Sequence, residues 1–472
     1  MDRHPPAWLE RVSLRCCAWS ERWIPDAYVF AVLAVIIVAA AAIALGSPLT
    51  QTAKAFGDGF WSLIPFTMQM SFIIIGGYVV ASSPPAARLI DKLAALPKSG
   101  RGAVCWVAAI SMLLSLLHWG LSMILGSLLV RALARRENLT MDYRAAGAAA
   151  YLGLGSVWAM GLSSSAAQLQ ANPSSMPPAL LPITGVIPFT ETIFLWQSIA
   201  LTVILIMVTL VIVWFTAPLN ENAQTARSMQ VVLETPTIET TAKTVRPGEW
   251  LEHSPLLNVL VAALGAVWLF QEFASKGAAL AISSLNTYNF LFVMLSLLLC
   301  WRPRIFIDAT ARSVGGVSGV LIQFPFYGGI AAILTSAVGS DGQSIAHHLS
   351  TFFAHAATKE SFPVVMGIYS AVLGFFVPSG GGKWIIEAPY VMQAANELKV
   401  HLGWAVQVYN AAEALPNLIN PFWMLPLLGI LKLRARDVIG FTMIQFIVHV
   451  PLVLLMLWAF GLTLEYRPPV MP

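Results

Sequence analysis

Charge is scarce in this sequence. Only 11% of the 472 residues are Asp, Glu, Lys or Arg, against roughly 25% in soluble domains. Apolar residues take their place: 57% of the chain is hydrophobic and the mean hydropathy is +0.73. A membrane-spanning helix needs about 20 mostly apolar residues, and the chain contains many such runs. This composition excludes a soluble enzyme with one large core and predicts an all-α polytopic membrane protein.

Cysteines are few, and the motifs of several enzyme classes are missing. The spacing of Cys16, Cys17, Cys105 and Cys300 fits neither a metal site nor a disulfide framework. The sequence contains no His-Glu-x-x-His and no phosphate-binding Gly-Lys-Ser loop, so neither a metalloprotease nor an ATP-driven pump is indicated. We therefore expect no enzyme activity, no metal and no organic cofactor.

The apolar runs predict a multi-span layout. A polar, proline-containing stretch at 217–253 predicts a cytoplasmic linker between two membrane repeats, 27–216 and 254–462. The remaining segments are a cytoplasmic N-terminal segment, 1–26, and a C-terminal tail, 463–472. Full spans are expected near 27–45, 60–81, 145–170, 192–215, 254–272, 285–301, 313–337, 403–431 and 438–462.

Two further apolar segments, near 103–134 and 361–396, break at small and flexible residues. The first breaks at His118–Ser122 and the second at Pro378–Gly382. A break inside hydrocarbon leaves backbone amides and carbonyls without partners, and it survives only where protein or a water-filled cavity surrounds it. Neither break contains a polar loop, so we expect two re-entrant helical hairpins. Paired breaks of this kind indicate the binding site of a secondary transporter.

Basic residues predict the orientation, because cytoplasmic loops are enriched in them. With a cytoplasmic N-terminus, most of the 27 Lys and Arg residues fall in cytoplasmic loops. The C-terminus is then periplasmic, the first hairpin opens to the cytoplasm, and the second opens to the periplasm. The two repeats therefore have inverted topology. The basic residues orient the chain in the lipid bilayer and form no nucleic-acid patch.

Each repeat also contains a helix that degrades into small and polar residues. The first is Gly153–Ser165, which follows Tyr151, and the second is Glu413–Trp423, which follows Tyr409. Glycine and proline in these stretches weaken or break the helical hydrogen-bond ladder. We expect two unwound transmembrane helices that converge with the two hairpin tips on one site.

The residue types at these breaks suit an anion and a coupling ion. Helix N-termini present free amides to a carboxylate, and unwound carbonyls with Ser and Asn oxygens suit Na⁺. Close packing of helices through small residues is the alternative for the Gly triplet. The predicted substrate-binding residues are Ser379, Gly380, Gly381, Gly382, Lys383, His118, Trp119, Gly120 and Ser122. The predicted ion or substrate contacts are Ser163, Ser164, Ser165, Glu413, Asn417 and Asn420.

Ionisable residues at membrane depth are rare and need partners. Lys383 requires Glu387, Glu413 or a substrate carboxylate beside it. It is therefore a candidate for anion binding or ion coupling, with a structural ion pair to Glu387 as the alternative. His118 is either a proton carrier or a neutral, hydrogen-bonded histidine.

The sequence resembles the bacterial short-chain fatty-acid transporters associated with acetoacetate and butyrate uptake, within the ion-transporter superfamily. The resemblance spans nearly the whole chain. It is carried by Trp23–Asp26, Gly57–Trp61 with Met68–Met70, Gln323–Tyr327, Pro378–Gly382 and Pro421–Trp423.

The resemblance implies uptake of small monocarboxylates across the bacterial inner membrane, coupled to an H⁺ or Na⁺ gradient. It also implies a homodimer in which a transport domain moves like an elevator. One departure stands out: the family commonly has His where this chain has Lys383. A fixed cation there could replace a coupling cation or strengthen anion binding, which questions Na⁺ dependence.

We therefore predict a secondary active transporter of short-chain fatty acids. A dicarboxylate or other organic-anion symporter of the same superfamily is the first alternative. A channel or a membrane enzyme is the second, although the sequence offers no convincing nucleophile–base pair.

Overall fold

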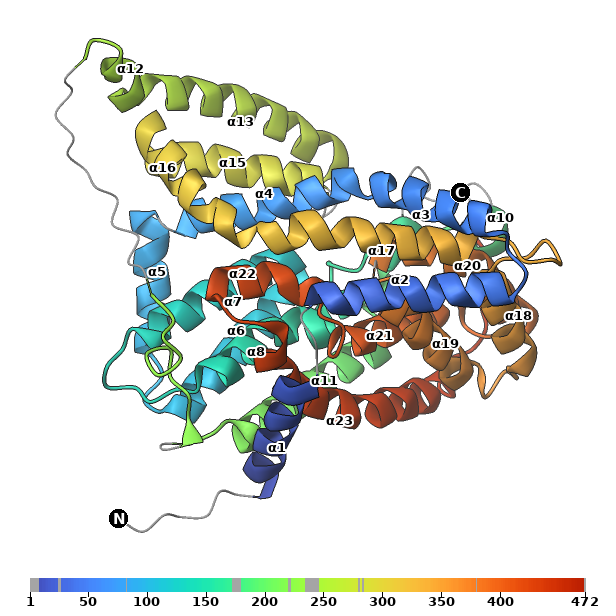
Figure 1. Cartoon of the computed structure of the whole chain (residues 1–472). Helices are drawn as coiled ribbons and strands as arrows, with labels where there is room; N and C mark the ends of the chain where they lie inside the picture. Colours follow the sequence, from blue (N-terminus) through green and yellow to red (C-terminus); the bar gives the residue numbers. More distant parts are fainter. Residues whose placement is uncertain are drawn as a thin grey trace.

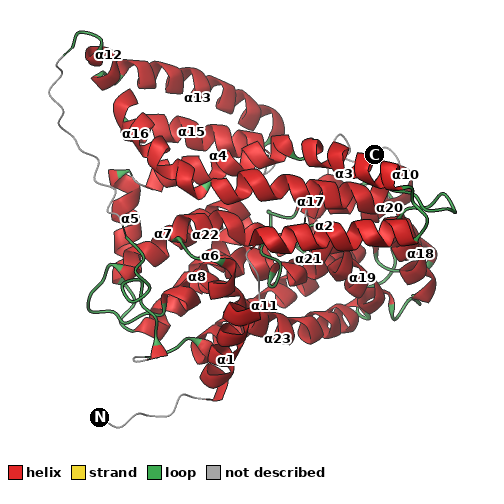
Figure 2. Ribbon diagram, in the orientation of Figure 1, coloured by secondary structure: helices red, strands yellow, loops and turns green. Residues whose placement is uncertain are grey.

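The computed structural model describes residues 8–23, 27–81, 83–171, 180–219, 222–233, 246–278, 281, 284–378 and 380–470. Within these residues the chain is almost entirely helical, as Figure 2 shows. The only β-structure in the described part is a pair of isolated bridges, Gly185 with Val470 and Val338 with Ser344. The fold is therefore all-α, as the composition predicts. Part of the predicted linker, 234–245, lies outside the described residues.

The first half of the chain contains the following helices: α1 (Trp8–Trp23), α2 (Ala27–Ala44), α3 (Leu49–Ser62), α4 (Ile64–Ala81), α5 (Pro84–Ala95), α6 (Gly100–Leu117), α7 (Trp119–Ala134), α8 (Tyr143–Leu152), η1 (Gly153–Val157), η2 (Trp158–Met160), α9 (Ser165–Ala171), α10 (Leu181–Thr184), η3 (Phe189–Glu191) and α11 (Trp196–Thr216).

The second half contains α12 (Glu249–His253), α13 (Leu256–Lys276), α15 (Leu285–Cys300), α16 (Pro303–Ser313), η5 (Val314–Gly316), α17 (Ser318–Ser336), α18 (Ile345–Ala356), α19 (Phe362–Phe376), α20 (Gly380–Glu397), α21 (Leu402–Asn417), η6 (Phe422–Met424), α22 (Leu425–Leu431) and α23 (Ala435–Gly461).

Seven helices of the described chain are long and apolar enough to cross a membrane, or up to eight if α21 and α22, bent by 74°, form one broken span. The chain is thus a multi-pass membrane protein. Two of the predicted spans, 27–45 and 285–301, correspond to shorter apolar helices, Ala31–Ala44 and Asn286–Cys300. Conversely, α6 is long enough to span by itself, although the sequence predicts it as one arm of a hairpin.

The helices form two packed groups (Figure 1). One group, here called the α17 layer, consists of α2, α3, α4, α13, α15, α16 and α17. The other, here called the hairpin body, consists of α1, α6 to α9, α11 and α19 to α23 with the short helices between them. Contacts of α4 with α7 and of α17 with α22 join the two groups.

Glycines bring α3 and α17 into backbone contact. A Cβ atom added to Gly59 would lie 2.5 Å from the carbonyl oxygen of Gly328, which is closer than van der Waals contact allows. Small residues at helix interfaces permit this close approach in membrane proteins, where dispersion contacts replace the hydrophobic effect as the driving force. A larger side chain at Gly59 would therefore separate these two helices.

The two helical hairpins open toward opposite ends of the molecule. At the base of α6 and α7, the indole of Trp106 donates to the carbonyl of Leu93 at 3.0 Å, and Arg136 donates to the carbonyl of Ala94 at 2.7 Å. Both carbonyls belong to α5, whereas α19 and α20 pack against α18. Figure 1 places α5 and α18 at opposite ends. Inverted repeats would require this arrangement, but the repeats and the domain boundaries themselves stay predictions.

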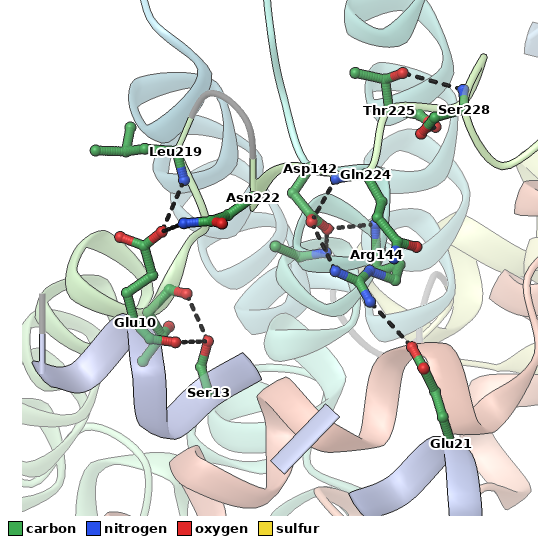
Figure 3. A network of polar contacts seen from close by, with 12 residues as sticks. Glu10, Ser13, Glu21, Asp142, Arg144, Leu219, Asn222, Gln224, Thr225 and Ser228 are labelled. Carbon is green, nitrogen blue, oxygen red and sulfur yellow. Dashed lines mark hydrogen bonds and ion pairs between the residues drawn. The ribbon is translucent and has the colours of Figure 1, made fainter. Parts of the chain in front are cut away.

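Helix α1 is docked onto the hairpin body (Figure 3). The carboxylate of Glu10 accepts hydrogen bonds from Arg101 at 2.7 Å and from Asn222 at 3.1 Å. The Ser13 hydroxyl donates to the carbonyl of Thr216 at 2.8 Å. Farther along the helix, Glu21 pairs with Arg144 at 3.0 Å, and Arg144 pairs with Asp142 at 3.0 Å. The sequence predicts only a cytoplasmic segment here, not these contacts.

Candidate functional site

His118 forms the tip of the first hairpin. Its extended backbone (φ −157°, ψ 116°) ends α6 and begins α7. Its Nδ1 atom accepts hydrogen bonds from the amides of Gly120 at 3.1 Å and Leu121 at 3.4 Å. Because Nδ1 accepts, we assign the ring proton to Nε2, which has no hydrogen-bond partner among the described residues. The tip therefore presents one buried, unused donor.

The rest of this tip is held within the hairpin. The hydroxyl of Ser122 donates to the carbonyl of Ser111 at 2.7 Å, which ties α7 to α6. The amide of Ser122 donates to the carbonyl of His118 at 3.2 Å, so the amides of Gly120, Leu121 and Ser122 all have acceptors. His118 therefore contributes a buried polar atom at this tip that has no partner among the described residues.

Aromatic rings connect the first tip to both groups of helices. The imidazole of His118 stacks on Tyr288 of α15, with ring centroids 3.8 Å apart and planes 9° apart. Trp119 meets Trp423 edge-on at 5.1 Å. Phe324 of α17 stacks on Phe422 at 4.0 Å. These rings line the seam between the α17 layer and the hairpin body.

The stretch after α8 departs from α-helical geometry, as its glycines predict. Five residues form a π-turn, η1, and the next three form a 3₁₀-turn, η2. Two glycines let this stretch lie against the backbone of the first hairpin. A Cβ atom at Gly153 would lie 2.3 Å from the carbonyl of Ser111, and one at Gly161 would lie 2.4 Å from the carbonyl of Leu116.

The serines that follow η2 link separate interruptions. The Ser163 hydroxyl donates to the carbonyl of Ser115, at 2.5 Å, near the first hairpin tip. The Ser164 hydroxyl donates to the side-chain oxygen of Asn410 in α21 at 2.9 Å. These contacts make Ser163 and Ser164 structural connections between elements that are far apart in the chain.

The second hairpin breaks after Phe376, where α19 ends, and α20 begins at Gly380. Ser379 lies outside the described residues. A Cβ atom at Gly380 would lie 2.3 Å from the Trp158 ring, and one at Gly381 would lie 3.3 Å from Cβ of Ser165. The Tyr409 hydroxyl donates to the carbonyl of Gly380 at 2.5 Å. The glycines therefore bring the second tip against the unwound stretch of the first half.

The interruption of α21 begins later than the sequence predicts. The helix continues through Pro416 to Asn417, and the bend follows at 418–421. One missing amide donor at Pro416 is tolerated so close to the helix end. Asn420 secures the bend: its Nδ2 donates to the carbonyl of Phe375 at 2.6 Å, and its Oδ1 accepts from the hydroxyl of Tyr327 at 3.3 Å.

Asn417 contrasts with Asn420. Its backbone carbonyl accepts from the Tyr151 hydroxyl at 2.9 Å, but neither polar atom of its side chain has a hydrogen-bond partner among the described residues. The side chain is fully buried. Burial of an unpaired amide costs free energy, so Asn417 is a candidate contact for an ion, water or substrate.

Lys383 lies at the centre of a buried ionic cluster. Its ammonium contacts the Ser370 hydroxyl at 2.7 Å, Glu387 Oε1 at 2.8 Å and Glu413 Oε2 at 2.7 Å. It also lies 4.3 Å from the ring centre of Tyr409. Lys383, Glu387 and Glu413 are all 0% exposed. The Lys383 ammonium also donates to the carbonyl of Ser370 at 2.9 Å. An ammonium has three protons, and the two oxygens of Ser370 and Glu387 Oε1 accept them.

The two carboxylates of the cluster are not equivalent. Glu387 accepts hydrogen bonds at both oxygens, from Lys383 and from the Ser370 hydroxyl at 2.9 Å. Glu413 Oε2 is close to the ammonium but is not aligned for a hydrogen bond, so that contact is electrostatic. Glu413 Oε1 has no hydrogen-bond partner in the described part of the chain.

The structure thus brings most of the predicted residues into one connected region, with the contacts between the two hairpins running through 153–165. Sequence reasoning missed Trp158, Tyr288 and Ser370, for which the sequence carries no signal. Tyr409 marks the predicted repeat, but nothing in the sequence indicates that its ring covers Lys383.

Comparison with known proteins gives consistent matches over almost the whole chain. The family described as "Short chain fatty acid transporter" matches residues 8–460. Two curated relatives are named "Putative short-chain fatty acid transporter". The one from Escherichia coli (strain K12) is 33% identical over 433 residues, which cover 91% of this chain and 95% of the relative. The one from Haemophilus influenzae is 30% identical over 457 residues, which cover 95% and 99%.

Two solved structures show distant likeness. The YdaH transporter of Alcanivorax borkumensis is 15% identical with a TM-score of 0.43, and the match covers 93% of this chain and 98% of that one. Neisseria gonorrhoeae MtrF, described within a class of antimetabolite efflux pumps, is 13% identical with a TM-score of 0.42, and the match covers 97% and 100%.

Proposed function

The chain belongs to the short-chain fatty acid transporter family, and we propose that it is a secondary active carrier of small monocarboxylates such as butyrate or acetoacetate, driven by an H⁺ or Na⁺ gradient. The observation that supports the proposal is that elements at both hairpin tips contact the same interrupted stretch, 158–165, which is also hydrogen-bonded to α21. Irregular backbone at membrane depth is typical of the binding sites of ion-coupled carriers.

The substrate carboxylate would bind between the two tips. The unused Nε2–H of His118 supplies a hydrogen-bond donor at the first tip. At the second tip, α20 begins with Gly380, Gly381 and Gly382, so a carboxylate can approach the helix N-terminus closely. Gly382 is exposed, whereas Gly380 is buried against Trp158. Asn417 adds a buried amide nearby in the same body.

The charge of the site favours a substrate with one carboxylate. Lys383 is the cation beside the Gly triplet, and two buried glutamates already neutralise it. A dicarboxylate would bring a second negative charge into a region without a free cation among these residues. Burial of an unpaired charge costs several kcal/mol, so a dicarboxylate is the weaker alternative.

The two groups of helices suit an elevator motion. In this proposal the hairpin body carries the substrate and the α17 layer stays fixed, with the aromatic seam as the sliding surface. The protein would act as a homodimer in the bacterial inner membrane, with a cytoplasmic N-terminus. The basic residues Arg101, Arg136 and Arg144, which lie at the α5 end of the hairpin body, support this orientation.

Reconstitution into liposomes tests the proposed function. Purified protein should catalyse saturable exchange of labelled acetoacetate for internal acetoacetate, with rates subtracted for protein-free liposomes because short-chain acids cross bilayers unaided. Unlabelled butyrate should compete, and succinate should not. Strong competition by succinate would move the assignment to a dicarboxylate carrier, and non-saturable ion flux without exchange would indicate a channel.

A further inference from the structure

We propose that the coupling ion is a proton and that Glu413 carries it, with Lys383 and Glu387 as its fixed counter-charges. This inference rests on the proposed carrier function and names its coupling site. It is argued from the charge, burial and hydrogen bonding of the cluster formed by these three residues with Ser370 and Tyr409.

The charges of the cluster do not balance. One ammonium and two carboxylates leave a net charge of −1 when all three are ionised, and all three side chains are 0% exposed. A net charge buried in a low dielectric is strongly unfavourable unless something neutralises it. One additional positive charge makes the cluster neutral, and a proton on one carboxylate supplies that charge without requiring further space.

The hydrogen bonds of the two carboxylates indicate which one takes the proton. Ionised Glu387 is stabilised at both oxygens, by Lys383 at 2.8 Å and by the Ser370 hydroxyl at 2.9 Å. Hydrogen bonds to the charged form favour that form. Glu413 receives no aligned hydrogen bond from the described residues and has one oxygen without any partner. Glu413 is therefore the group that changes its protonation state.

The charged and titratable groups around Glu413 come from the helices that pack on α21. Helix α20 contributes Lys383 and Glu387, α19 contributes Tyr369, and Tyr409 lies one turn earlier on α21. The other elements that pack on α21 are η1, η2, α9 and α23. The first three contain no titratable residue. On α23, Arg436 and Asp437 lie in the first turn, where Asp437 pairs with Arg434, and His449 is engaged by Thr209 and Gln445. Lys383 is thus the charged group in direct contact with Glu413, and its ammonium occupies the space beside Oε2 that a metal cation would need.

Glu413 is connected to the second hairpin tip through Lys383 and Tyr409. Lys383 holds α20 to α21 through Glu413, while Glu387 lies on the same helix as Lys383. Protonation of Glu413 removes its negative charge. This weakens the ion pair with Lys383 that joins α20 to α21, and it leaves the Lys383–Glu387 pair within α20 in place. Tyr409 lies between the ionic cluster and the second hairpin tip. Its ring covers the ammonium of Lys383, and its hydroxyl donates to the carbonyl of Gly380. Proton occupancy and the position of the Gly380 tip are therefore linked, and the linkage is reciprocal.

The experiment measures initial rates in proteoliposomes that differ only in the imposed gradient. For the wild type, an inward proton gradient should stimulate labelled acetoacetate uptake above the rate of protein-free liposomes, and a Na⁺ gradient at equal pH should not. In Glu413→Gln, we expect acetoacetate exchange at a reduced but measurable rate. The stimulation of uptake by the proton gradient should fall roughly tenfold or more, which is within the usual range of coupling between two sites. Glu272→Gln is the matched control, because that carboxylate lies on α13 and its ion-pair partner among the described residues is the exposed Lys276.

Several outcomes would overturn the inference. Na⁺-driven uptake by the wild type at constant pH would do so, and so would full proton stimulation in Glu413→Gln. If Glu413→Gln fails to insert, Glu413→Asp, which keeps a titratable carboxyl, must retain proton stimulation. Absence of any saturable exchange in the wild type is a different result, since it would remove the proposed carrier function itself.

Discussion

The imidazole ring of His118 lies parallel to the phenol ring of Tyr288, with centroids 3.8 Å apart. This stack joins the tip of the first hairpin to α15, and therefore joins the hairpin body to the α17 layer. If the body moves against the layer during transport, this contact must break.

The first prediction concerns this stack. Aromatic pairs contribute about 0.5–1.5 kcal/mol beyond their buried area, so Tyr288→Leu should destabilise the present arrangement and change the acetoacetate exchange rate several-fold. Tyr288→Phe keeps the ring and removes only a hydroxyl that lacks a partner among the described residues, so it should behave like the wild type. Equal effects of both variants would contradict a role for stacking.

A second prediction separates the two nitrogens of His118. His118→Ala removes the N-cap of α7, at a cost of about 0.5–2 kcal/mol, and also removes the Nε2 donor. His118→Asn restores an oxygen that can cap the helix but leaves no equivalent of the Nε2 donor. We expect Asn to recover the Tm in detergent while KM for acetoacetate stays raised in both variants. Recovery of KM by Asn would exclude Nε2 from substrate binding.

The third prediction concerns the close contact between Gly380 and Trp158. Gly380→Ala places a methyl group 2.3 Å from the indole ring, which should displace the tip and reduce exchange strongly. Trp158→Phe in the same chain shortens the side chain and should restore part of the activity. Gly57→Ala is the control, because nothing lies within 4 Å of its added Cβ. Wild-type exchange in Gly380→Ala would show that the tip position does not matter.

The fourth prediction tests the docking of α1. Glu10→Ala leaves Arg101 and Asn222 without the carboxylate that they contact at 2.7 Å and 3.1 Å. The loss of a buried ionic partner costs about 3–5 kcal/mol, so the Tm in detergent should fall clearly. Asp58→Asn breaks the exposed pair with Lys54 and should leave Tm unchanged. A similar Tm for both variants would mean that α1 adds little stability.

The fifth prediction is a pH dependence at His401, which precedes α21. Burial lowers the pKa of His401, and this effect exceeds the opposing effect of Glu191. The folded state therefore favours neutral histidine. The contribution of neutral His401 to the free energy of unfolding is fully present above the ordinary histidine pKa of about 6.5. This contribution is lost as pH falls through the lowered pKa of the folded state.

His401→Asn provides the comparison for this pH dependence. Nδ1 of His401 caps α21 by accepting from the amide of Trp404 at 3.0 Å, and Asn can replace that cap without titrating. The Tm of the wild type should decline more steeply than that of His401→Asn between about pH 7 and pH 5. Parallel profiles would exclude His401 as the responsible group.

The sequence predicts the interruptions well because they follow from local chemistry. Backbone that lipid cannot satisfy must be enclosed, and the glycines, proline and histidine at both tips mark where this occurs. The structure breaks at His118 and again between α19 and α20, and it forms a π-turn where Gly153 and Gly155 lie, followed by a 3₁₀-turn. The all-α class follows in the same way from the long apolar runs.

What the sequence does not predict depends on contacts between distant residues. Both glutamates named as possible partners of Lys383 contact it together, and both oxygens of Ser370 accept from its ammonium. No periodicity relates Ser370, Lys383 and Glu413, so their meeting is a product of packing between α19, α20 and α21. The division into two groups of helices and the docking of α1 escape sequence reasoning for the same reason.

The attachment of α1 has a practical consequence. Its polar contacts reach α6, α8 and α11, all within the hairpin body. A fluorophore attached at the start of α1 would therefore move with that body in the proposed elevator motion. Distance measurements from such a label to a second one on α3 would test for this displacement without any modification near the hairpin tips.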